Sequence, residues 1–203
     1  MNARQILTSV RGFTVGEMAA ALSVAGLLAG AAAPALQDYI DEARHARARQ
    51  DVRAIASAMS RLEGDVLGQS AKPNGWATYE LLVGAGEAPK AGGTGDGAWL
   101  AIPGTANVGL LDDQLVTNTA GYASRPARQV EWIRGWHGPY LEAGVGPDPW
   151  GHRYAINVQA LAGGGSSTVV LSAGPNGLVE TAFRSPVIVP GGDDLIALVA
   201  TGR

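Results

Sequence analysis

Between Met18 and Leu36 the chain has no charged residue, and Ser23 carries the only hydroxyl or amide side chain of this run. As an α-helix the run would be about 28 Å long at about 1.5 Å per residue, enough to cross most of the hydrocarbon core of a bilayer. Glu17 stands directly before it. A carboxylate in a membrane-spanning helix is costly, and such residues are usually paired and functional. We therefore expect a membrane helix whose first turn carries a functional acid.

Positive charges on either side of the apolar run bear on its orientation. Arg4 and Arg11 precede the run, and Arg44, Arg47 and Arg49 follow it. The cationic leader predicts that the N-terminus stays in the cytoplasm. The soluble part is then expected on the opposite face, which is periplasmic or external in a bacterium.

The rest of the 203-residue chain is long enough for one modest globular domain. A formal net charge of −3 argues against nucleic-acid binding, and the absence of cysteine excludes disulfides, thiolate metal sites and a Cys nucleophile. No nucleophile elbow, His-Glu-x-x-His, P-loop or dinucleotide fingerprint is present, so we do not expect an enzyme. His137, His152 and Asp148 lie near one another in sequence and leave an acid–base or metal cluster as the alternative.

Helical periodicity continues beyond Pro34. The later apolar residues recur at spacings of three and four and form one stripe, namely Ala48, Val52, Ile55, Met59 and Leu62. We expect one helix over about 14–62. It should kink or unwind near Pro34, because proline removes a backbone hydrogen bond and clashes with the preceding turn. The stripe should pack against the globular domain.

Strands are predicted late in the chain. Residues 153–158 and 167–172 read as a hairpin around the glycines at 163–165, and residues 195–200 add a third strand. Residues 76–83 are expected to form a short helix. The result is an α+β fold, in which a small antiparallel β-sheet is laid on the stripe of the long N-terminal helix.

Two aromatic motifs precede and open this sheet: Trp136-His137-Gly138-Pro139-Tyr140-Leu141 and Asp148-Pro149-Trp150-Gly151-His152-Arg153-Tyr154. Asp148-Pro149 favours a turn. Tyr140 and Trp150 offer large surfaces to bury against the helix. We expect these aromatic residues to be structural, with an aromatic carbohydrate site as the alternative.

The segment Gly12-Phe13-Thr14-Val15-Gly16-Glu17 resembles the processing site of type IV prepilins. The resemblance implies that a dedicated peptidase cuts after Gly12 on the cytoplasmic side. Phe13 would then be the mature N-terminus, usually N-methylated. It also implies that Phe13, Glu17 and the helix-kinking Pro34 are assembly residues. A secretory signal peptide cleaved near residues 31–35 and a plain membrane anchor are the alternatives.

The charge of Glu17 favours the prepilin alternative on physical grounds. We see no need for this carboxylate in a signal peptide or in a plain anchor. In a filament it can pair with the α-ammonium of Phe13 on a neighbouring copy. Such a pair would neutralise two charges that lipid penalises separately, and it would set the stagger between subunits.

The two aromatic motifs are similar to the Trp-x-Gly-Pro-Tyr-Leu and Asp-Pro-Trp-Gly-x-x-Tyr patterns of the major pseudopilins of type II secretion systems. The resemblance implies a leader peptide at 1–12, a transmembrane and filament-core helix at 13–36, its amphipathic continuation at 37–64 and a pilin-like domain at 65–203. The implied function is structural: a single-pass subunit polymerises from the bacterial inner membrane into a periplasmic filament that helps push proteins out.

The implied partners are further copies of the chain, minor pseudopilins, the prepilin peptidase and the inner-membrane assembly platform, with a cytoplasmic ATPase as the driver. A type IV pilus subunit, used in adhesion, motility or DNA uptake, is the second interpretation. It shares the N-terminal pattern, but the aromatic motifs disfavour it. A monomeric membrane-anchored binding module is a third, of a different class.

The segment Ser172–Gly177, followed by Asp193 and Asp194, resembles the loop where that family binds calcium. The implied ligands are side chains and loop carbonyls: Asn176, Asp193 and Asp194, with the backbone of Ala173 and Leu178. Calcium takes several oxygen ligands of these kinds. Asn176 stands where the family commonly has Asp. The alternative is a Gly-Pro-Asn-Gly turn with two solvated aspartates.

Overall fold

The computed structural model describes residues 12–66, 69–71, 73–92, 97–105, 107–124, 135–161 and 167–199. The chain divides into two compact units, one ending at Ala43 and the other beginning at Arg44. Most of the expected leader, with Arg4 and Arg11, lies outside the described residues, and so does the expected hairpin loop at 163–165.

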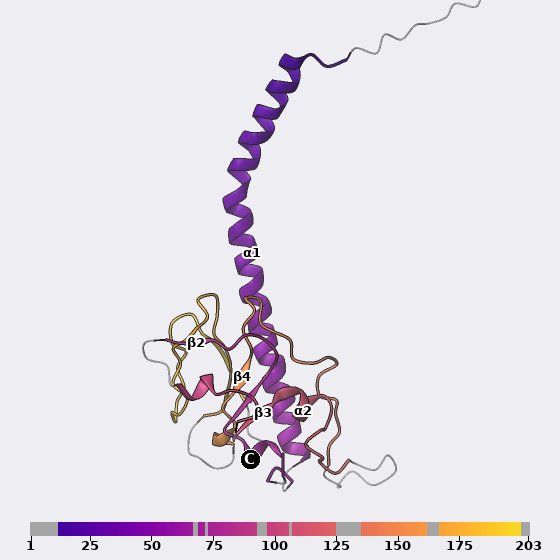
Figure 1. Cartoon of the computed structure of the whole chain (residues 1–203), viewed down its shortest axis with the longest axis vertical. Helices are drawn as coiled ribbons and strands as arrows, with labels where there is room; N and C mark the ends of the chain where they lie inside the picture. The colour runs from indigo at the N-terminus through magenta and orange to yellow at the C-terminus, as the bar shows by residue number, and fades with distance from the viewer. Residues whose placement is uncertain are drawn as a thin grey trace, which may run out of the picture. The chain divides into compact units, whose positions relative to one another are not determined.

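Helix α1 (Val15–Asp65) is an α-helix of 51 residues (Figure 1). The predicted long helix is therefore confirmed, and it passes through Gly64 to end three residues beyond the expected position. It also continues through Pro34, so the expected unwinding does not occur there. The alanines on both sides of Pro34 favour the helix strongly enough to carry it across one lost hydrogen bond.

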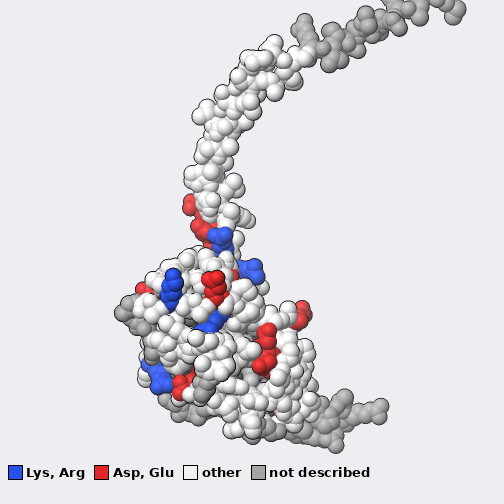
Figure 2. Space-filling view, viewed as in Figure 1, with Lys and Arg blue, Asp and Glu red and all other residues white. Residues whose placement is uncertain are grey.

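The early part of α1, from Met18 to Leu36, is apolar and exposed. Its most apolar 18-residue window has a mean hydropathy of 1.8, and none of that window is buried. By length and composition this helix could span a membrane. On the face that Figure 2 shows, the charged side chains in view lie on the later part of α1 and on the globular unit.

The second unit contains a five-stranded sheet with the order β3-β1-β4-β5-β7. Its strands are β1 (Leu81–Val83), β3 (Val108–Leu110), β4 (Ala155–Ile156), β5 (Val169–Ser172) and β7 (Leu195–Leu198). A separate pair joins β2 (Lys90–Ala91) to β6 (Leu178–Val179). The short helices are η1 (Trp76–Thr78), η2 (Gly97–Leu100), α2 (Leu111–Leu115) and η3 (Val158–Ala160).

The sheet is mixed, so the prediction of an antiparallel sheet is wrong at one edge. Strands β4, β5 and β7 pair antiparallel as expected, and so do β1 and β4. Strands β1 and β3 are parallel. Residues 84–107 lie between them, a connection long enough to return the chain to the same end of the sheet.

The predicted helix at 76–83 is also wrong. A single 3₁₀ turn, η1, is followed by β1, whose three residues are all buried. An apolar run this short has no period that separates helix from strand. Strand β4 is shorter than the predicted 153–158, because the chain turns into η3 at Val158.

Two hydrophobic clusters lie on the two faces of the sheet. On one face Leu82, Ile156 and Val170 pack in the cluster that contains the later part of α1, and all five residues of the predicted stripe are buried. On the other face, alternate strand residues such as Leu81 and Leu171 pack with Trp99, Phe183 and Ile188. A helix on one face of a small mixed sheet makes this unit α+β.

Candidate functional site

The first functional segment is the start of α1. Gly12 and Phe13 precede the helix, and the Phe13 side chain is 82% exposed. The Thr14 N–H and Oγ1–H both donate to Glu17 Oε2, at 2.8 and 2.9 Å. The Glu17 N–H donates back to Thr14 Oγ1 at 3.2 Å. This reciprocal arrangement is a capping box, with Thr14 as the N-cap.

The capping box corrects one step of the sequence argument. Glu17 does have a use in a single helix, because it satisfies an N–H that would otherwise lack a partner at the helix start. A plain anchor could therefore carry it. The helix dipole also favours a negative charge in the first turn, and Gln can occupy the same position of a capping box, so a comparison of Glu17 with Gln tests what the charge contributes beyond capping.

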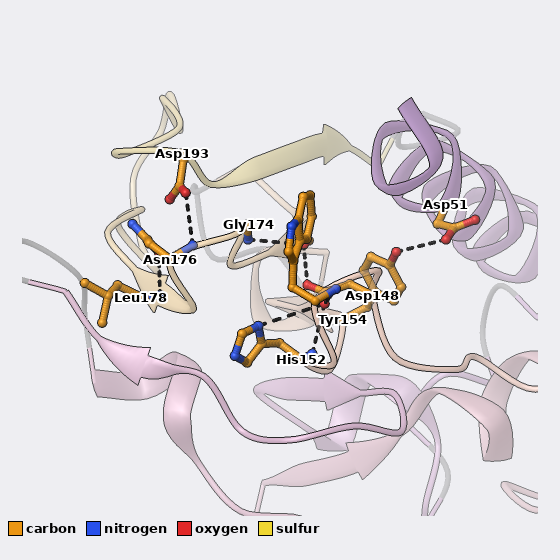
Figure 3. Close-up of polar contacts among 10 residues, drawn as sticks. Asp51, Asp148, His152, Tyr154, Gly174, Asn176, Leu178 and Asp193 are labelled. Atoms are coloured by element: carbon orange, nitrogen blue, oxygen red, sulfur yellow. Dashed lines mark hydrogen bonds and ion pairs between the residues drawn. The ribbon is translucent and has the colours of Figure 1, made fainter. Parts of the chain in front are cut away.

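The second functional segment joins α1 to the two aromatic motifs. The Tyr154 hydroxyl donates to Asp51 Oδ2 at 2.9 Å, and the Tyr140 hydroxyl donates to Asp65 Oδ2 at 2.9 Å (Figure 3 shows the Tyr154 contact). The Trp150 ring meets the ring of His45 edge-on, with centroids 5.0 Å apart. At least one aromatic side chain of each motif therefore contacts α1, which supports a structural role for both motifs.

In the first motif, small and aromatic residues are interdependent. A Cβ on Gly138 would lie 2.5 Å from the Trp136 ring, so only glycine allows this close approach. Trp136 in turn packs edge-on against Tyr140, with centroids 5.9 Å apart. The Tyr140 carbonyl accepts from Arg61 Nη2 at 2.9 Å, which adds a second contact with α1.

In the second motif, Asp148 is the centre of a turn, as the Asp-Pro pair predicts. Its Oδ1 accepts the N–H groups of Trp150 and His152 at 3.0 and 2.9 Å. Its Oδ2 accepts the Ser172 hydroxyl at 2.6 Å. Asp148 is 3% exposed, so these bonds are shielded from water. The carboxylate thereby ties the motif to the end of β5.

Of the alternative acid–base or metal cluster, the structure brings His152 beside Asp148. His152 Nδ1 lies 3.9 Å from Asp148 Oδ1, but that oxygen already accepts two backbone N–H groups. Within the ranges that the structure describes, no three His, Cys, Asp or Glu side chains form a group that could hold a metal ion. Asp148 and His152 are thus best understood as parts of a turn.

Three buried tyrosines make the stability of the globular unit sensitive to alkali. Burial raises the pKa of Tyr122 to about 12, and burial raises the pKa values of Tyr140 and Tyr154 as well. The hydrogen bond that Tyr154 donates to Asp51 is a further cause for Tyr154. A group whose pKa is higher in the folded state stabilises the fold below its unfolded value, about 10 for tyrosine.

We therefore expect the free energy of unfolding to be constant between pH 8 and about pH 9.5 and to fall steadily above about pH 10. Urea unfolding of the full chain in mild detergent would measure this. All five tryptophans follow Ala43, so their fluorescence reports the globular unit alone. Tyr154→Phe should cost about 1 kcal/mol at pH 8 and reduce the alkaline loss. A loss unchanged by this variant would contradict a contribution from Tyr154.

The third functional segment is the loop predicted to bind calcium. The structure brings its two halves together: the Asn176 N–H donates to Asp193 Oδ2 at 3.1 Å (Figure 3). The Asn176 Oδ1 accepts the Leu178 N–H at 2.6 Å. Asp194 holds together the two ends of the loop at 180–194, since its Oδ2 accepts the N–H groups of Glu180 and Thr181 and the Thr181 hydroxyl.

The alternative of a turn with two solvated aspartates is correct for the turn, since the Gly177 N–H donates to the Gly174 carbonyl at 3.3 Å, and wrong for Asp194. Asp194 is only 4% exposed, and burial raises the pKa of its carboxyl. One oxygen of each aspartate, Oδ1 of Asp193 and Oδ1 of Asp194, is buried without a hydrogen-bond partner. Buried carboxylate oxygens are costly unless a donor or cation faces them. The donor set of carboxylate and carbonyl oxygens is of the kind that suits calcium.

In comparisons with protein-family models, with curated proteins and with solved structures, no match to this chain is found. Sequence reasoning missed Asp51 and Asp65 as partners of the motif tyrosines, and it missed Glu180 beside Asn176. It also missed the capping box, although the Thr-x-x-Glu pattern of this box is visible in the sequence.

Proposed function

We propose that this chain is a structural subunit of a type II secretion pseudopilus and has no catalytic activity of its own. The observation that carries the proposal is the position of Glu17. It is the single acid at the head of an exposed apolar helix, five residues after a Gly12-Phe13 junction that resembles a prepilin processing site.

The proposed mechanism begins with cleavage after Gly12, which frees an α-ammonium at Phe13. The Glu17 carboxylate of a neighbouring copy binds this ammonium, and the two charges leave the membrane as a pair. Glu17 can keep its capping bonds meanwhile, because an ionised carboxylate has about four acceptor sites. Repetition of the contact sets the stagger of a homopolymer.

In the proposed filament the globular unit gives each copy its outer surface. We propose that calcium stabilises it, held by Asp193 and Asp194 with Asn176 and the backbone of Ala173 or Leu178. Calcium would supply positive charge to the two partnerless carboxylate oxygens. It would join the turn after β5 to the start of β7, which are adjacent strands.

The proposed location is the bacterial inner membrane, with residues 13–36 as a single span, Pro34 near its end, and the globular unit in the periplasm. The proposed partners are the prepilin peptidase, the inner-membrane assembly platform, minor pseudopilins and the ATPase behind them. A type IV pilus subunit would have the same N-terminus. The resemblance of the two aromatic motifs, which fasten to α1 through Tyr140 and Tyr154, favours the pseudopilus.

Mass analysis of the mature N-terminus tests this proposal directly. In cells that contain a prepilin peptidase, we expect a chain beginning at Phe13 with one added methyl group, recovered from the membrane fraction. A chain that still begins at Met1 in those cells would indicate a plain anchor. A chain that begins after the alanines at 31–35 would indicate a secretory signal peptide, and either result would overturn the proposal.

A further inference from the structure

Helix α1 carries two charged pairs of equal spacing: the acidic pair, Asp38 and Glu42, and the basic pair, Arg49 and Arg53. We infer that the basic pair of one copy binds the acidic pair of a neighbouring copy in the filament. The inference rests on the homopolymer of the proposed function. It adds a second contact between copies, besides the ion pair at the start of the helix.

The four charges have no partner within their own chain. All four side chains are exposed, and in the described part of the chain none of them makes an ion pair or a side-chain hydrogen bond. By contrast, Arg47 pairs with Asp51 one turn along the helix, with Nε 3.6 Å from Oδ2. The helix thus satisfies one of its arginines locally and leaves the basic pair available for a contact outside the chain.

The spacing of the charges sets the register of that contact. Asp38 precedes Arg49 by eleven residues, and Glu42 precedes Arg53 by the same number. Partners on one helix must be three or four residues apart, so these pairs cannot form within a chain. Copies anchored in one membrane are parallel. A parallel copy shifted by eleven residues, about 16 Å at about 1.5 Å per residue, brings both acids level with both arginines at once.

The surface around the basic pair has room for another helix. Arg49 and Arg53 line an open groove together with Ala46 and Gln50. A second groove begins at the same Arg53 and runs between α1 and strand β7. The α1 residues that line this second groove are all small: Ala56, Ser57 and Ser60. Small side chains allow a packed helix to approach closely.

A second copy of the chain fits this surface better than a lipid does. The segment with the acidic pair also exposes large apolar side chains beyond the proposed membrane span, with Tyr39 72% and Ile40 42% exposed. Exposed apolar groups next to complementary charges are typical of an interaction surface. An anionic lipid headgroup would bind the basic pair but would leave the acidic pair and these apolar side chains uncovered.

The new contact joins different neighbours from those joined at the start of the helix. Phe13 and Glu17 are four residues apart, whereas the two charged pairs are eleven residues apart. One shift between two parallel copies cannot satisfy both contacts. Each exposed ion pair is weak, but the filament repeats the contact in every copy, and repeated contacts strengthen one another.

The filament yield of charge-reversal variants tests the inference. Arg49→Glu combined with Arg53→Glu should lower the amount of sheared filament about tenfold, because like charges then face each other. Addition of Asp38→Arg and Glu42→Arg to the same chain should restore most of the filament. Mass analysis must show a mature chain beginning at Phe13 in each variant, because new arginines near the span can alter insertion.

A matched control changes the net charge equally at exposed residues outside α1. Lys90→Glu combined with Arg184→Glu meets this condition and should leave filaments at the wild-type level. Wild-type filament levels in the variant with both α1 arginines reversed would overturn the inference. A defect in that variant without rescue by the reversed acids would also overturn it and would indicate an anionic lipid as the partner.

Cysteine crosslinking tests the register, since the natural chain has no cysteine. Tyr39→Cys combined with Gln50→Cys places thiols eleven residues apart, so a short bifunctional maleimide should link copies into multimers within filaments. Tyr39→Cys combined with Ser57→Cys, eighteen residues apart, should give far fewer links. Filaments in which the first pair does not crosslink would overturn the register but not the proposed function. Absence of filaments from the wild-type chain would overturn the proposed function itself.

Discussion

Glu17→Gln is expected to abolish filament assembly while the chain remains in the membrane with its helix capped. Gln keeps a side-chain oxygen that can accept from the Thr14 N–H and Oγ1–H, because both Glu and Gln occur at this position of a capping box. It loses the negative charge that would bind the α-ammonium of a neighbouring Phe13. Removal of one partner from a desolvated ion pair leaves the other charge uncompensated. We expect the amount of filament to fall on the order of a hundredfold or more.

Fractionation of cells that overproduce the chain would measure this effect. Filaments are sheared and pelleted, membranes are collected separately, and the chain is quantified in each fraction. Mass analysis should show that Glu17→Gln is still processed to Phe13, so a loss of filaments cannot be attributed to failed cleavage. Filaments at the wild-type level would contradict the proposed pairing.

Thr14→Val is the matched control for capping. It removes the hydroxyl that donates to Glu17 and accepts its N–H, and it leaves the charge of Glu17 intact. If the charge drives assembly, this variant should retain far more filament than Glu17→Gln. Wild-type filament levels in Glu17→Gln, together with a loss of filaments in Thr14→Val, would show that Glu17 acts as a cap and not as half of an ion pair.

The helix was predictable because its signal is local and repeated. Every member of the stripe from Ala48 to Leu62 is buried, since a period of 3.6 places those residues on one face. Strands β1 and β3 were not predictable in the same way. Each has three residues, too few for a period, and their parallel pairing depends on the path of residues 84–107. The same limit explains the wrong expectation of a sheet that is antiparallel throughout.

The candidate sites show the same division between local and distant information. The capping box spans four residues and is visible in the sequence as Thr14-x-x-Glu17. The partners of the motif tyrosines are not visible, because Asp51 is 103 residues from Tyr154 and Asp65 is 75 residues from Tyr140. From the sequence alone, an aspartate on the polar side of a helix is expected to be solvated. The segment that covers it becomes known only from the fold.

Asp148→Ala is expected to cause a large loss of stability in the globular unit. The variant removes the acceptor of three hydrogen bonds, from the Trp150 N–H, the His152 N–H and the Ser172 hydroxyl. These donors surround a carboxylate that is 3% exposed, so water cannot easily replace it. Bonds to charged groups contribute about 1.5–3 kcal/mol each, and the contributions are not additive. We expect the free energy of unfolding to fall by about 3 kcal/mol or more.

Urea unfolding followed by tryptophan fluorescence measures the loss of stability. Two further variants show how much of this loss comes from individual hydrogen bonds. Ser172→Ala removes one of the three donors and should cost about 1–2 kcal/mol. Asp148→Asn keeps one acceptor oxygen but places an NH₂ group against a donor, so its cost should lie between those of the other two variants. Because Ser172 Oγ also accepts the Gly174 N–H at 3.3 Å, Asp148 supports the turn that leads to Asn176. Asp148→Ala should therefore also reduce the Tm rise on calcium addition. A cost below about 1 kcal/mol would mean that the Asp-Pro-Trp-Gly turn holds its shape without this carboxylate.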